Sequence, residues 1–275
     1  MKDAIYDRIS TRTYEKKKLS EEEIKIISEA IDETKLMNSP FGHKIEFFTD
    51  FKTLDPEGEA KRIGTYGFIK NASSFVGGTI QNEFTGIVDY GYLFEYFILK
   101  LTQKGLSTCW LAGTFDRNAF SHHVKKGDII PAITPIGYPE DKMSLRERAI
   151  RFAVKANRRK SFEEMFYLND INHPLKEDSN HPLQLPLELV KLAPSASNKQ
   201  PWRIIIIDNI IHFYLQETPN YNTNRPFIIQ ALDMGISLCH FEIGLKDLGL
   251  NYEMNVISHP LPQGFEYILS FILNK

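Results

Sequence analysis

The segment APSASNKQPWRIIII, residues 193–207, joins three kinds of local structure within fifteen residues. The apolar positions before it, at 185, 187, 189, 190 and 192, recur with helical spacing, and Pro194 ends that helix. The four isoleucines at 204–207 favour a buried strand. Between them lies a loop of small polar residues that can present hydroxyls, an amide and backbone N–H groups to a ligand. An ordinary helix-to-strand turn is the alternative interpretation.

Composition excludes several classes of function. The chain has 275 residues, 42% of them hydrophobic, which is enough for one large domain or two ordinary ones. A net charge of −2 without a long basic run argues against nucleic-acid binding. No apolar run approaches the roughly 18 residues that a membrane span needs, and the charged N-terminus does not resemble a signal peptide. Cys109 and Cys239 lie far apart in apolar surroundings, so we expect reduced core residues and a cytoplasmic protein.

The spacing of apolar residues and turn formers predicts a series of helices and strands. Ser20 followed by Glu23 is a capping box that starts a helix ending near Lys35. The longest helix, over 84–104, is apolar on more than one face and is therefore expected to be buried on several sides. Gly105 fits its C-terminal cap. Other expected features are helices at 3–9 and 144–157, a short helix after Asp116, strands at 45–48, 72–80 and 129–138, a charged surface segment at 50–64 and a linker-like stretch at 168–182.

The long helix has a second copy near the C-terminus. Six identical residues recur at a constant offset of 144 positions over each helix and its cap: Asp89 and Asp233, Gly91 and Gly235, Phe97 and Phe241, Leu101 and Leu245, Gly105 and Gly249, Leu106 and Leu250. The elements that flank the two copies also follow the same order. We interpret this as a duplicated unit, with halves at 1–160 and 161–275 that pack as one body and imitate a two-fold dimer. One α+β domain with chance similarity is the alternative.

Three segments together resemble the FMN-dependent nitroreductase family. RISTR at 8–12 resembles the family's N-terminal Arg-Arg-Ser-x-Arg motif, and PSASNKQPW at 194–202 is close to its Pro-Ser-x-x-Asn-x-Gln-Pro-Trp motif. The third segment runs from the long helix through GLSTCWLAG at 105–113 to GYP at 137–139, and it ends in Arg159-Lys160. The second segment is the most specific of the three, and the resemblance covers nearly the whole chain.

The resemblance implies an α+β fold of nitroreductase type, with three-layer α/β/α units and mainly antiparallel sheets. Members of this family are usually homodimers that hold each flavin between subunits, with one motif from each subunit. Here the first half keeps the arginine motif and the second half keeps the Ser-Asn loop, whereas the counterpart loop at 37–44 has lost the pattern. The resemblance therefore predicts a single-chain pseudo-dimer with one intact FMN site and one degenerate site. Such a chain can be monomeric because its dimer is internal.

The resemblance also implies which residues hold FMN. Guanidinium groups suit the phosphate, and Arg158 is an alternative to Arg159 in this role. At Ile9 the family usually has a second basic residue, so this position departs from the pattern. Trp110, Trp202 and the tyrosines are expected in the core rather than stacked on a substrate. The implied cofactor site comprises Arg8, Ile9, Ser10, Arg12, Tyr66, Gly67, Leu111, Ala112, Gly113, Arg159, Pro194, Ser195, Ala196 and Asn198.

The activity that the resemblance implies is that of an oxidoreductase of nitroreductase type. NAD(P)H passes a hydride to FMN N5, and the flavin then reduces a nitroaromatic, a quinone or another small acceptor by a ping-pong mechanism. No catalytic side chain and no metal are expected, because the flavin carries the chemistry. The adjacent histidines at 122–123 lack metal-site spacing with other ligands. A flavin-binding sensor or storage protein with little turnover, and a structural α+β protein without flavin, are the alternatives.

Overall fold

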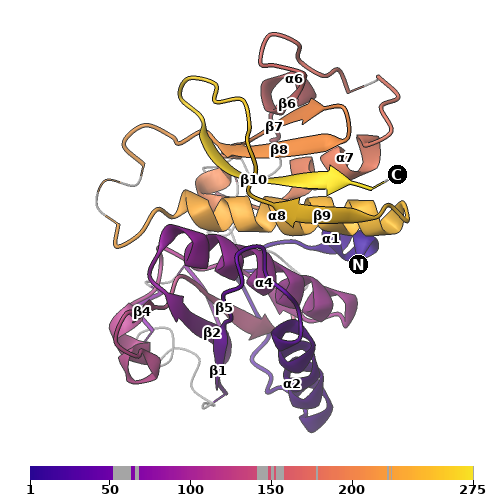
Figure 1. The fold of residues 1–275 in the computed structure, drawn as a ribbon. Coiled ribbons are helices and arrows are strands. Elements are labelled where there is room, and N and C mark those ends of the chain that lie inside the picture. The colour runs from indigo at the N-terminus through magenta and orange to yellow at the C-terminus, as the bar shows by residue number, and fades with distance from the viewer. Residues whose placement is uncertain are drawn as a thin grey trace.

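The chain forms two α+β units that pack on each other through their longest helices (Figure 1). The structure is a computed structural model, and it describes residues 1–274 except 52–62, 66–67, 141–147, 150–151, 153–157, 178, 222 and 224. The charged segment expected at 50–64 and the helix expected over 144–157 therefore lie largely outside the described residues.

The first unit has an antiparallel sheet with one long helix against its inner face. The strands follow the order β1 (Glu46–Asp50), β2 (Ser74–Gln81), β5 (Ile133–Gly137) and β3 (Ser107–Thr108), and β4 (Asp128–Ile129) pairs with the C-terminal end of β2. The helices are α1 (Lys2–Asp7), α2 (Glu21–Lys35), α4 (Phe84–Gln103) and the 3-10 helix η1 (Arg117–His123). Phe47 of β1 packs on Phe94 of α4. The next side chain, Phe48, points to the opposite face and packs on Phe120 of η1.

The second unit repeats this plan. Its strands follow the order β6 (Phe166–Leu168), β7 (Trp202–Ile207), β8 (Ile210–Leu215), β10 (Glu266–Leu273) and β9 (Tyr252–Asn255). Strand β6 runs parallel to β7, and the other pairs are antiparallel. The helices are α6 (Phe162–Met165), α7 (Gln184–Leu192), α8 (Gln230–Asp247) and the short 3-10 helix η2 (Ala196–Asn198). Phe213 and Phe271 of the sheet pack on Phe241 of α8.

Helices α4 and α8 lie side by side between the two sheets (Figure 1). They touch at two glycines that occupy equivalent places in the repeat. A Cβ on Gly91 would overlap the carbonyl oxygen of Leu232, and a Cβ on Gly235 would overlap that of Val88. The two backbones therefore approach closely only because these positions have no side chain. Both helices are buried on nearly all sides, as the apolar pattern of the first one predicts.

The α+β class, the mainly antiparallel sheets and the two tandem units are confirmed. The predicted capping box is also confirmed, because Ser20 Oγ accepts from the Glu23 N–H and a Glu23 carboxylate oxygen accepts from the Ser20 N–H. Gly105 follows α4 with φ +76°. The stretch 168–182 starts on β6 inside the second unit, so it does not link the units. The exact boundary between the halves stays a prediction.

Two expectations from composition are met by the described residues. Neither cysteine forms a disulfide, and both are buried in the core. None of the helices described is long and apolar enough to cross a membrane.

Candidate functional site

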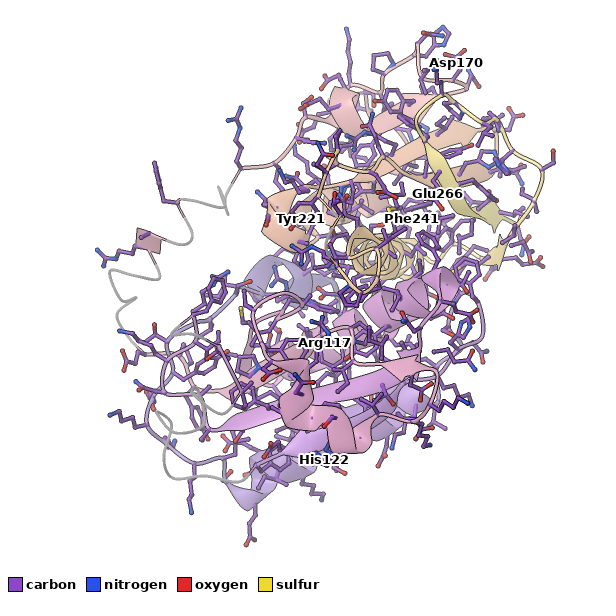
Figure 2. All side chains as sticks on the ribbon, turned by 90° about the vertical axis from the view of Figure 1, so that its left-hand side faces the viewer. Arg117, His122, Asp170, Tyr221, Phe241 and Glu266 are labelled. Atoms are coloured by element: carbon purple, nitrogen blue, oxygen red, sulfur yellow. The ribbon has the colours of Figure 1, made fainter. Side chains whose placement is uncertain are left out.

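A cavity of about 390 Å³ lies where the two units meet. This volume falls within the usual range for sites that bind small molecules. Figure 2 labels Tyr221, a lining residue, on the second unit, and Arg117 on the first unit below it. The lining residues come from distant segments of the chain: Arg8, Ile9, Ser10, Arg12, Phe68, Trp110, Ala112, Gly113, Thr114, Arg159, Pro194, Ser195, Ala196, Ser197, Asn198, Tyr221, Arg225, Ile229, Leu232, Asp233 and Ile236.

Four arginines line the cavity: Arg8, Arg12, Arg159 and Arg225. The Arg8 side chain follows α1 and is only 8% exposed, and its Nε lies 3.7 Å from Glu95 Oε1. Burial, together with the nearby charge of Arg8, lowers the pKa of Arg159. Arg12 is buried, with its guanidinium over the ring of Phe68. Two partly desolvated guanidinium groups that repel each other are stabilised by an anion bound between them.

The carboxylate of Glu95 on α4 holds two side chains of the cavity wall. Glu95 is fully buried, accepts a hydrogen bond from Trp110 Nε1 at 2.7 Å, and lies near Arg8. Its other close partner is His240 Nε2 on α8, at 2.9 Å. The second ring nitrogen of His240 lies 2.8 Å from the Leu189 carbonyl oxygen, so both nitrogens face acceptors. The contact between Glu95 and His240 therefore joins the two units across their seam.

The Ser-Asn loop between α7 and β7 has an uncommon backbone. Ser197, Asn198 and Gln200 have φ values of 49°, 55° and 49°, in the left-handed region. Hydrogen bonds hold this conformation: Ser195 Oγ accepts from the Gln200 N–H at 2.9 Å. Buried Gln200 in turn accepts from the Lys160 N–H at 2.9 Å through Oε1, and donates to the Asn198 carbonyl oxygen at 3.1 Å. The loop thus binds the segment at 158–160 to its own side of the cavity.

The hydrogen bonds between the Ser-Asn loop and the segment at 158–160 distinguish the two adjacent arginines. Arg159 donates from Nη1 to Asn198 Oδ1 at 3.2 Å, and its side chain lines the cavity. Arg158 is exposed and does not line the cavity, and only its backbone carbonyl takes part, accepting from Asn198 Nδ2 at 2.8 Å. Of the two, only the Arg159 side chain therefore lines the cavity.

The first turn of α8 adds an acid to a cavity lined by arginines. The Asp233 carboxyl accepts from the Ala196 N–H at 2.8 Å. Burial raises the pKa of Asp233 well above its usual value, although the Ala196 N–H and the charge of Arg225 act in the opposite direction. Arg225 itself lies over Gly113, where a Cβ would come within 2.9 Å of Nη1. Gly113 therefore leaves room for this guanidinium beside the cavity.

In the first unit the counterpart loop folds onto the equivalent acid, Asp89. The carboxylate accepts from Ser39 Oγ at 3.0 Å and from the N–H groups of Phe41 and His43 at 3.0 and 2.9 Å. The His43 ring also contacts it through Nδ1 at 2.9 Å and reaches Glu83 through Nε2 at 2.6 Å. Burial lowers the pKa of His43, but its hydrogen bonds to the two carboxylates outweigh burial and raise the pKa overall.

Most of the residues predicted from sequence meet at this cavity: Arg8, Ile9, Ser10, Arg12, Ala112, Gly113, Arg159, Pro194, Ser195, Ala196 and Asn198. Leu111 does not. It pairs with Ile133 through its backbone, and its side chain is fully buried away from the cavity. Alternation along an extended segment explains this, because Trp110 and Ala112 point to one side and Leu111 to the other. Tyr66 and Gly67 lie outside the described residues.

The sequence argument missed several lining residues: Phe68, Trp110, Thr114, Ser197, Tyr221, Arg225, Ile229, Leu232, Asp233 and Ile236. Trp110 was expected in the core, but its side chain lines the cavity and donates a hydrogen bond to Glu95. Trp202 is buried in the core as expected. The lining positions at 229, 232, 233 and 236 follow helical spacing, which marks one face of α8. This helical spacing was the sequence signal that could have identified the α8 side of the cavity.

Comparison with known proteins identifies relatives of the whole chain. A family model described as "Putative TM nitroreductase" matches residues 1–245. No relative with a curated function matches the chain. The fold is similar to the crystal structure of a putative nitroreductase from Thermotoga maritima, at 20% identity and a TM-score of 0.61, over 100% of this chain and 94% of that chain.

Shorter proteins match about half of the chain. One is an FMN-dependent nitroreductase from Clostridium difficile R20291, at 20% identity and a TM-score of 0.41, over 52% of this chain and 90% of that chain. Another is a nitroreductase family protein from Clostridium novyi NT, at 18% identity and a TM-score of 0.40, over 52% of this chain and 88% of that chain.

Proposed function

This chain belongs to the nitroreductase family whose model it matches, and from that membership we propose that its cavity binds FMN and that the protein is an NAD(P)H-dependent flavin oxidoreductase. The observation that carries the proposal is the composition of the cavity. Segments at 8–12 and 194–198, nearly the whole chain apart, line one space together with buried arginines. The shorter relative from Clostridium difficile, which is named as FMN-dependent, is consistent with this choice of cofactor.

The cationic part of the cavity fits the phosphate of FMN. Nε of Arg8 is buried and has no hydrogen-bond partner among the described residues. Burial, and next to it the nearby charge of Arg8, lowers the pKa of Arg159. A phosphate dianion would satisfy both guanidinium groups, and the fork of donors on arginine suits phosphate oxygens.

The remaining walls fit a flat aromatic ring. The apolar lining residues include Trp110 from the first unit and Ile229, Leu232 and Ile236 from the second. The isoalloxazine ring is largely apolar with hydrogen-bonding edges, so it needs apolar faces and a few polar groups at its rim. The side chains of the Ser-Asn loop and the backbone around Gly113 are the polar groups that would meet such edges.

The protein itself would bind and orient rather than react. Bound FMN would supply the redox chemistry, accepting electrons from NAD(P)H and delivering them to a small acceptor such as a nitroaromatic or a quinone. Arg8 and Arg159 would hold the phosphate, and Glu95 would keep Arg8 and Trp110 in place. Because reductant and acceptor would use the same cavity in turn, we expect ping-pong kinetics.

The same residues support a single-chain pseudo-dimer with one flavin. In the first unit the loop that corresponds to the Ser-Asn loop is closed on Asp89 by its own hydrogen bonds. We therefore propose one FMN per chain and a monomer whose dimer interface is internal. Two buried cysteines that form no disulfide favour a reducing compartment, and we propose the cytoplasm.

Anaerobic titration of the purified protein with NADH and then NADPH tests the proposal. After reconstitution with FMN, we expect a flavin absorption spectrum, one FMN per chain, and bleaching by at least one of the two reductants. A bound flavin that neither reductant bleaches would instead support the sensor or storage function. A protein that stays colourless and gains no thermal stability from FMN would contradict flavin binding altogether.

A further inference from the structure

One acid of the cavity has an oxygen that accepts no hydrogen bond from the described part of the chain. Asp233 is 2% exposed. One of its oxygens, Oδ1, accepts from the Ala196 N–H at 2.8 Å. The other, Oδ2, is buried and has no hydrogen-bond partner among the described residues, yet Asp233 lines the cavity. A buried carboxyl oxygen without a partner is costly, so its presence needs a reason.

The internal repeat supplies a reference state for this residue. Asp89 stands 144 positions earlier, on the same turn of the equivalent helix. Its Oδ2 accepts from Ser39 Oγ at 3.0 Å and from the His43 N–H at 2.9 Å, and it contacts the His43 ring at 2.9 Å. Every one of these groups can act as a donor. The position therefore suits a carboxylate that accepts several hydrogen bonds.

The loop of the second unit cannot supply those donors in its present shape. Ser197 and Asn198 have left-handed backbone conformations, and the loop turns its other polar groups elsewhere. Ser197 Oγ accepts from the Tyr221 hydroxyl at 2.8 Å, and Ser195 Oγ accepts from the Gln200 N–H. No described residue donates to Asp233 Oδ2 as His43 donates to Asp89, and Asp233 lines the cavity.

We propose that Asp233 Oδ2 accepts a hydrogen bond from an O–H or N–H group of the flavin, in the place that His43 fills beside Asp89. This inference rests on the proposed function, because it takes FMN as the ligand. Burial without a donor raises the pKa of Asp233, and a donor from the ligand would favour the ionised carboxylate again. The first unit thus carries a copy of the site closed by its own histidine.

Asp233→Asn is the matched test, with Asp89→Asn as its control in the same chain. The asparagine oxygen can still accept from the Ala196 N–H, which places its NH2 group where Oδ2 was and opposes a ligand donor. We expect Asp233→Asn to weaken FMN binding by about 10- to 100-fold. We expect Asp89→Asn to leave FMN affinity within about 2-fold, since its donors come from the protein. Quenching of FMN fluorescence measures both dissociation constants.

Thermal unfolding without flavin provides the second measurement. We expect the Tm of flavin-free Asp233→Asn to equal or exceed that of the wild type, because the substitution removes an unsatisfied acid. Asp89→Asn should lower Tm, because it breaks satisfied hydrogen bonds. A merely structural role for Asp233 would lower both Tm and affinity together, and that outcome would overturn the inference.

Lumiflavin, which has the ring without the ribityl chain, identifies the donor. If Asp233→Asn weakens both FMN and lumiflavin, the donor is a ring N–H group; if it weakens FMN alone, the donor is a ribityl hydroxyl. Both results support the inference. If Asp233→Asn binds FMN as tightly as the wild type, the inference is contradicted, while the proposed function stays intact. Wild-type protein that does not bind FMN contradicts the proposed function itself.

Discussion

Asp89 and Asp233 occupy the same turn of two equivalent helices, and their surroundings differ. Around Asp89 the loop of the first unit folds inward, with Ser39 and His43 bonded to the carboxylate. Around Asp233 the described part of the second unit's loop donates only the Ala196 N–H, and a cavity lies beside the acid. The helices and sheets that carry the two acids follow the same plan. The contrast teaches that a duplicated fold can keep its framework while a few loop residues decide whether a site is open or filled.

The largest expected effect is on stability, at the contact between α4 and α8 that joins the two units. Gly235→Ala should destabilise the protein by about 3 kcal/mol or more, because the new methyl group would meet the backbone of α4 at Val88. Gly91→Ala should behave alike, since its methyl group would meet the Leu232 carbonyl. Ser28→Ala, at an exposed position of α2, is the control and should stay within about 0.5 kcal/mol. Urea unfolding measures all three variants, and normal stability of Gly235→Ala would contradict the close helix contact.

The second prediction separates the open site from its surroundings. Arg159→Ala should weaken FMN binding by about 10- to 100-fold, because a charge-assisted contact to phosphate is lost. Arg158→Ala removes the neighbouring charge but leaves the cavity lining unchanged, so its affinity should stay within about 2-fold. Flavin fluorescence at fixed ionic strength measures both variants. Equal losses in the two would mean that general charge, rather than the cavity, attracts the ligand.

The third prediction concerns the closed copy. His43→Ala should destabilise the protein by about 1 kcal/mol at pH 5.5, a modest value because His43 is partly exposed to solvent. The pKa of His43 is raised in the folded state, so its stabilising effect is full below the unfolded value near 6.5. It is lost as the pH rises through the folded value. Unfolding free energies of wild type and variant should therefore converge at pH 9, and a constant difference would rule out the charged histidine.

Much of the framework could be predicted from sequence because it depends on local patterns. The capping box at Ser20, the apolar long helix and the Pro194 helix end all depend on neighbours within a few residues. The repeat with an offset of 144 also indicated that two such units pack together. The Ser-Asn loop was identified as a candidate site by its motif alone.

The rest of the site depends on contacts between distant segments. Tyr221 and Arg225 lie in a stretch without periodic pattern, so nothing local indicated that both line the cavity or that Arg225 reaches Gly113 of the first unit. Leu111 was assigned to the site with its neighbours because the motif was transferred as a block, whereas strand alternation places Trp110 there instead. The repeat identified Asp233 as a repeated residue. That its Oδ2 has no hydrogen-bond partner among the described residues depends on the loop conformation, which the repeat does not predict.

The smallest expected effect is the pH dependence of stability in the absence of flavin, which tests whether Asp233 Oδ2 lacks a partner. The pKa of Asp233 is raised above its unfolded value, chiefly by burial, so the unfolded chain releases this proton at a lower pH than the folded protein does. The wild type should therefore lose stability relative to Asp233→Asn as the pH rises above about 4. We expect a difference below about 1 kcal/mol, or about 2–4 °C in Tm, because the Ala196 N–H and the charge of Arg225 offset part of the cost of ionising the buried acid. A Tm difference that does not change between pH 5 and pH 8 would mean that Asp233 already has a partner, and its environment would then match that of Asp89.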